Sequence, residues 1–90
     1  MKLEDALFNW LQIKLVATAR QDDQAAWDTL AFFEQILTED HGLTDFAITK
    51  IDDTMIHLKY EKDGRVKLQL YPRERGEQLL TDIESNPKYN

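Results

Sequence analysis

The 90-residue sequence predicts a single α+β domain of ααβββα order. A helical hairpin and a short C-terminal helix are expected to pack on one face of a three-stranded antiparallel meander. Apolar residues recur every three or four positions up to residue 41 and again after Pro72, which is the period of helices. Between these segments they recur at every second position, which is the period of half-buried strands. We expect residues 1–84 to form the domain and residues 85–90 to form a flexible C-terminal tail.

The first helix is predicted over residues 3–20, where Leu3, Leu7 and Leu11 recur at helical spacing. Its apolar arc is wider than this stripe and covers well over half of the circumference. The side chains that widen it are Phe8, Ile13 and Val16. This helix is therefore expected to pack on two sides, and its second side could meet either the second helix or another subunit.

The second helix is predicted over residues 23–41, after a connection of about three residues that makes an antiparallel hairpin. Asp22 or Asp23 can cap its free N–H groups. Gly42 follows its last residue and suits the left-handed conformation that ends many helices. Trp27 and Phe32 flank its main apolar stripe.

Three strands follow, and the sequence KYEKDGRVK (residues 59–67) joins the second to the third. A two-residue turn there would place Tyr60 opposite Lys67, which mixes apolar and polar side chains on one face. A three-residue loop ending at Gly64, with a β-bulge, avoids that mixing. It directs three aliphatic side chains of the third strand inward: Val66, Leu68 and Leu70.

This register predicts a polar outer face on the sheet, with Lys59 directly opposite Lys67. Opposed like charges are mildly unfavourable. Long, solvated lysines on a strand also discourage aggregation, so the pair needs no function. The alternative is that the face receives an acidic partner. The residues expected to bind it are His57, Lys59, Arg65, Lys67 and Tyr71.

The excess of apolar surface on the two helices predicts a homodimer, because three short strands cannot cover it. The residues expected at the subunit contact are Phe8, Ile13, Val16, Trp27 and Phe32.

The amino-acid composition excludes several kinds of catalytic and binding site. The chain has no cysteine, so disulfides and thiolate metal sites are excluded, and its one serine, Ser85, falls in the expected tail. Its three glycines are isolated from one another, so no phosphate-binding loop is present. We therefore expect no enzymatic activity, no cofactor and no bound metal. Glu4 and Asp5 interrupt the apolar run that a signal peptide needs, and a cytoplasmic location is expected.

These observations predict a small, acidic, non-enzymatic protein-interaction module that acts as an adaptor, a regulator or a chaperone-like partner. The alternative is weak binding of nucleic acid or another polyanion, because residues 54–76 hold six basic and three acidic side chains. The net charge of -6 and the pI near 4.7 disfavour nucleic acid. No apolar run is long enough to cross a membrane.

Overall fold

The structure is a computed structural model that describes residues 1–85. The helices α1 (Leu3–Ala19) and α2 (Gln24–Gln35) are followed by a π-helical turn, η1 (Ile36–Asp40). Strands β1 (Leu43–Ile51), β2 (Met55–Lys62) and β3 (Arg65–Pro72) come next, and then helices α3 (Arg73–Gly76) and α4 (Gln78–Ser85). The α+β class and the ααβββα order are confirmed, with the last helix broken into two pieces at Glu77. Helix α4 includes Ser85, and the rest of the expected tail, residues 86–90, lies outside the described residues.

The helical hairpin begins and ends as the sequence predicts. The carboxylate of Asp23 accepts a hydrogen bond from the N–H of Ala26 and caps α2. Gly42 takes a left-handed φ of 68° directly after the hairpin, where a residue with a side chain would be strained.

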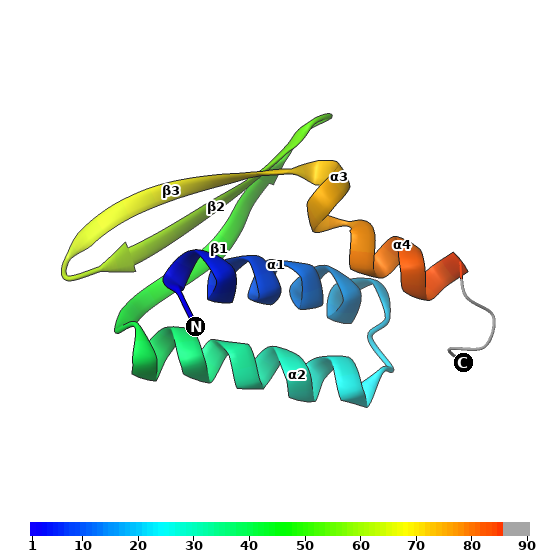
Figure 1. Cartoon of the computed structure of the whole chain (residues 1–90), viewed down its shortest axis with the longest axis horizontal. Coiled ribbons are helices and arrows are strands. Elements are labelled where there is room, and N and C mark those ends of the chain that lie inside the picture. The colour runs from blue at the N-terminus through cyan, green and yellow to red at the C-terminus, as the bar shows by residue number, and fades with distance from the viewer. Residues whose placement is uncertain (86–90) are drawn as a thin grey trace.

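Helix α1 lies at the centre of the molecule. The three-stranded sheet covers one of its sides, α2 covers another, and α4 runs beside its C-terminal half (Figure 1). Leu7, Trp10, Leu11, Val16 and Ala17 are all almost fully buried. The wide apolar arc of α1 is therefore covered within a single chain, and the second side that the sequence left open is packed against α2.

The sheet has the order β1-β2-β3, and all its pairs are antiparallel. All the helices lie on one side of it (Figure 1), so it has an inner face toward α1 and an outer face. Ile56 and Leu58 of β2 point inward and are fully buried. Phe46 of β1 meets the ring of Trp10 edge-on, with the ring centroids 5.2 Å apart.

The predicted register of the β2–β3 hairpin is wrong. The turn has two residues, Asp63 and Gly64, with φ values of 53° and 75°. Because both φ values are positive, the turn has the type I′ geometry that suits tight hairpins. Tyr60 pairs with Lys67 and Leu58 with Gln69, one residue away from the predicted pairing along β3. A one-residue shift reverses the faces of a strand.

The predicted register assumed that the helices cover the whole inner face, but they cover only part of it. The β2–β3 turn projects past the N-terminus of α1 (Figure 1), and Arg65 and Lys67 are exposed although they are on the inner side. Aliphatic side chains at these inner positions would have gained little burial. Tyr71, near the end of β3, is buried against α1.

Candidate interaction surface

The outer face of β3 carries a row of exposed aliphatic side chains. Val66 is 56% exposed, Leu68 is 69% exposed and Leu70 is 47% exposed. We call these three residues the β3 strip. They alternate along an edge strand, so they form one continuous apolar line on the side of the sheet that faces away from the helices.

Polar side chains of β2 border the β3 strip. Glu61 is opposite Val66, Lys59 is opposite Leu68 and His57 is opposite Leu70. Because directly opposed residues of an antiparallel pair share a face, these three side chains lie beside the strip on the outer surface. The surface therefore combines an apolar line on β3 with a mixed-charge line on β2.

His57 is held by the turn that precedes its strand. Its Nε2 lies 2.8 Å from an Oδ2 oxygen of Asp52. The other carboxylate oxygen of Asp52 accepts backbone N–H groups from Thr54 and Met55 at 3.0 and 2.7 Å. The hydrogen bond from His57, reinforced by those backbone donors, lowers the pKa of Asp52 well below its usual range. This arrangement fixes the imidazole at one end of the surface.

The register divides the residues expected to bind a partner between the two faces. His57 and Lys59 lie on the outer face as predicted. Arg65, Lys67 and Tyr71 lie on the inner face, so the opposed pair of Lys59 and Lys67 does not exist. Lys59 is instead opposite Leu68.

Tyr71 is buried against the helices and is not on the outer surface. Its ring lies 5.4 Å from that of Phe8, centroid to centroid, and its hydroxyl donates to the backbone oxygen of Glu4. Burial, with the nearby carboxylate of Glu4 as a smaller cause, raises the pKa of Tyr71 to about 12. Its size and its hydroxyl explain why this residue, rather than an aliphatic one, fills the inner position.

Some of the residues expected at a helical dimer contact are covered by other residues of the same chain. Ile13 and Val16 are buried. Phe8 is half-buried, with Tyr71 on one side and the guanidinium of Arg75 5.2 Å from its ring centroid. Ile13 and Val16 are covered within the chain because α1 already has neighbours on both of its apolar sides.

Trp27 and Phe32 remain exposed on α2, at 36% and 57%. The indole N–H of Trp27 donates to the backbone oxygen of Gln21 at 2.9 Å, which fixes the ring against the turn between α1 and α2. Phe32 meets the ring of Phe33 edge-on at 5.4 Å. Trp27 and Phe32 are thus exposed apolar side chains of α2, outside the β3 strip.

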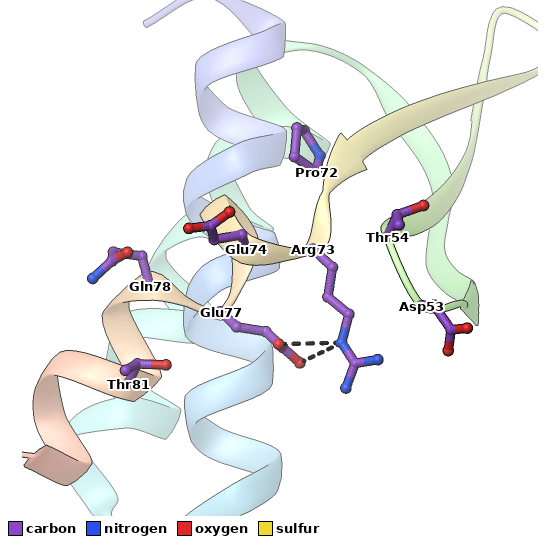
Figure 2. Close-up of a pocket in the computed structure, with 8 residues that line it drawn as sticks. All are labelled: Asp53, Thr54, Pro72, Arg73, Glu74, Glu77, Gln78 and Thr81. Atoms are coloured by element: carbon purple, nitrogen blue, oxygen red, sulfur yellow. Dashed lines mark hydrogen bonds and ion pairs between the residues drawn. The ribbon is translucent and has the colours of Figure 1, made fainter.

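A hollow with a volume of about 550 Å³ lies where β3 meets α3 (Figure 2). Its main cation, Arg73, is already engaged. The Nε of Arg73 donates to both carboxylate oxygens of Glu77, at 3.2 and 3.1 Å, and its Nη1 donates to the backbone oxygen of Asp52. The hollow is polar and open, and the side chain of Arg73 links Glu77, between α3 and α4, to Asp52 in the turn between β1 and β2.

Sequence reasoning did not place the side chains of the β3 strip on the outer face. The dipeptide Asp63-Gly64 was the available signal, because Asp-Gly flanked by alternating apolar residues favours a two-residue type I′ turn. That turn alone would have placed the strip outside.

Among residues 1–85, no helix combines the length and apolarity that a membrane span requires. Within the same residues, histidine and carboxylate side chains do not gather in the threes that would hold a metal ion. Comparison with protein-family models, curated proteins and solved structures gives no match.

Proposed function

We propose that this protein is a non-enzymatic protein-interaction module, of the adaptor, regulator or chaperone-like kind, which binds another polypeptide along β3. The observation that carries the proposal is the β3 strip, a continuous apolar row on an edge strand. Exposed apolar rows of this kind mark interaction sites in soluble proteins. A cytoplasmic setting is part of the same proposal, in keeping with a chain that lacks cysteine.

The chemistry of such binding is strand addition. An extended segment can bond to the free backbone groups of an edge strand while its alternate side chains meet the row on the outer face. Here the outer face would offer it Val66, Leu68 and Leu70, with Lys59 alongside. A segment with apolar side chains on that face would be complementary.

The alternative function, weak binding of a polyanion, depends on a different part of the hairpin. Lys62, Arg65 and Lys67 border a hollow of about 460 Å³ on its inner side, near Leu3. The observed register thus moves the basic cluster away from the outer face. Loss of heparin binding in a Lys62→Glu/Lys67→Glu variant, with no loss in Leu68→Lys, would support this alternative.

Matched variants test the proposed function. Leu68→Lys changes the β3 strip, and Phe32→Lys changes an exposed apolar side chain of similar accessibility on α2. Proteins captured from a lysate of the source cells would be identified, purified and titrated against the wild type and both variants by calorimetry. We expect the wild type and Phe32→Lys to bind and Leu68→Lys to lose binding at least about tenfold.

The opposite pattern would contradict the proposal. If a purified partner binds Leu68→Lys as well as it binds the wild type, β3 is not the binding surface. If Phe32→Lys alone loses binding, the exposed area of α2 carries the interaction instead.

A further inference from the structure

The free edge of β3 presents the backbone groups of the same residues that form the β3 strip. The N–H of Arg73 donates to the backbone oxygen of Thr54 at 2.8 Å. This pair continues the register in which Ile56 is opposite Tyr71. Bonded and non-bonded pairs alternate in an antiparallel ladder, so odd-numbered residues of β3 bond to β2. Val66, Leu68 and Leu70 therefore direct their N–H and C=O groups away from β2.

The two edges of the sheet differ in how well they can receive another strand. The pairing of β1 with β2 shifts twice, between Leu43 and Asp45 and again between Ile48 and Lys50. Such irregularities protect an edge, because they bend the strand and break the spacing of its backbone groups. The pairing of β3 with β2 runs without a shift from Arg65 to Pro72. Of the two edges, β3 is the regular one.

We infer that the polypeptide that occupies this edge is a second copy of the chain. The two β3 strands pair antiparallel about a two-fold axis, with Leu68 opposite the partner's Leu68. The result is a continuous six-stranded sheet. This inference rests on the proposed function, since it names the segment that adds to β3.

The faces of the strand restrict the possible registers. Directly opposed residues share a face, so a pairing that keeps the outer row continuous must be centred on a residue. When it is centred on Leu68, all the free backbone groups of Val66, Leu68 and Leu70 are satisfied on both copies. When it is centred on Lys67, two lysines are opposed and Leu70 meets a turn residue. When it is centred on Gln69, Val66 meets Pro72, which has no N–H to donate.

The side chains agree with the backbone in the register centred on Leu68. On the outer face Leu68 meets its own copy, and Val66 meets the partner's Leu70. On the inner face Lys67 meets the partner's Gln69, and Arg65 meets the partner's Tyr71. No like charges are directly opposed, and every apolar residue of the row has an apolar partner. The strand is thus complementary to itself, as a two-fold interface requires.

The N-terminal half of β3 is also accessible from the inner side. Arg65 and Lys67 are exposed there, so none of the helices within residues 1–85 covers this part of the edge. A partner strand that approaches along it meets the β2–β3 turn region, which projects beyond α1 (Figure 1).

Single cysteines test the register directly, because the chain contains no cysteine of its own. In the proposed pairing the two Leu68 Cα atoms are about 5.5 Å apart, within the span of a disulfide. The two Val66 Cα atoms are displaced by four residues, roughly 13 Å or more, and cannot be bridged. We expect Leu68→Cys to form a cross-linked dimer under mild oxidation, whereas Val66→Cys and Leu70→Cys alone form little. An equimolar mixture of Val66→Cys and Leu70→Cys should cross-link, because Val66 is opposite the partner's Leu70.

A charge exchange gives an independent measurement by sedimentation equilibrium. Val66→Lys or Leu70→Glu alone should raise the dimer dissociation constant about tenfold, and the double variant should restore it to near the wild-type value. Circular dichroism would check that each variant folds. Recovery in the double variant requires that the two positions are opposed between copies.

The outcomes separate this inference from the proposed function. Self-pairing is overturned if the wild type stays monomeric at millimolar concentration and Leu68→Cys forms no cross-link. It is also overturned if the wild type forms a dimer that dissociates in the Phe32→Lys variant but not in Leu68→Lys. If Leu68→Lys still abolishes binding of a captured protein in either case, the proposed function stands and the strand comes from that other protein. If neither self-association nor the binding of a captured protein depends on Leu68, both the proposed function and the self-pairing of β3 are wrong.

Discussion

The inner and outer faces of the β2–β3 hairpin contain leucines in opposite environments. Leu58 of β2 points inward and has no exposed surface, whereas Leu68 of β3 points outward and is 69% exposed. The two side chains are chemically identical, but Leu58 lies in the central strand of the sheet and Leu68 lies in an edge strand. The comparison teaches that alternation along a strand defines two sets of side chains, and that the turn decides which set the helices cover.

The largest expected effect is the difference in the stability lost when Leu58 and Leu68 are each replaced by alanine. Leu58→Ala should lower the free energy of unfolding by about 2–5 kcal/mol, because it leaves a cavity in the core. Leu68→Ala should change it by no more than about 0.5 kcal/mol, as an exposed substitution does. Urea denaturation of both variants, at a concentration where the wild type is monomeric, measures the difference. Equal losses would mean that Leu68 is buried and that the register described for the hairpin is wrong.

A smaller effect is expected where α3 approaches the inner face. A Cβ atom on Gly76 would lie 2.6 Å from Cδ1 of Ile56, which is fully buried. Gly76→Ala should therefore destabilise the protein by about 1–3 kcal/mol through overpacking. Ile56→Val removes the Cδ1 atom, so the penalty of Gly76→Ala should shrink in that background. Thermal unfolding of the single and double variants completes the cycle, and a penalty that is unchanged by Ile56→Val would place the clash elsewhere.

Substitutions in the β2–β3 turn, which decides which side chains of β3 face the helices, should change stability in opposite directions. Gly64→Ala should cost about 1–2 kcal/mol, because φ is 75° at that position. Asp63→Asn should be neutral or stabilising by a few tenths of a kcal/mol, since Asn-Gly is also favoured in type I′ turns. Chemical denaturation of the two variants measures both changes. A loss of stability in Asp63→Asn would argue against a positive φ at Asp63.

The smallest effect concerns the pH dependence at the other end of the hairpin. The pKa of Asp52 is lowered by its hydrogen bond from His57 and by two backbone donors. Its ionised form is thus favoured in the folded state, and its contribution to stability is present above the unfolded pKa of about 3.9. That contribution is lost as the pH falls through the folded-state pKa. Asp52→Asn should be less stable than the wild type at pH 5, and the difference should narrow below about pH 4.

Denaturation curves between pH 2 and pH 6 would check this. His57→Gln is the matched control, because it removes the first of the donors and leaves the carboxylate in place. A difference between the wild type and Asp52→Asn that stays constant over the whole range would show that the charge of Asp52 contributes nothing.

Much of the fold could be predicted from the sequence because it follows from local patterns. The helical period, the cap at Asp23 and the left-handed Gly42 each depend on a few neighbouring residues. The inward row of β2, with Ile56 and Leu58, was also predictable, since it alternates with polar residues at a central strand. These features can be predicted without knowing which elements pack against each other.

The candidate surface could not be predicted in the same way. The sequence of β3 offers two alternating sets, one aliphatic and one made of Arg65, Lys67, Gln69 and Tyr71. Apolarity favoured the aliphatic set for the core. The tight Asp63-Gly64 turn and the contacts of Tyr71 with Phe8 and Glu4 selected the other set.

The sequence by itself determined the element order, the helix ends and the two-sided apolar surface of α1, because each depends on spacing and on nearest neighbours. Only the tertiary structure decided that α2 covers the second side of α1 and that the β3 strip faces solvent. The physical reason is that burial depends on where the helices end relative to the strands. The hairpin extends beyond α1, so an aliphatic row there gains no core contacts and stays exposed.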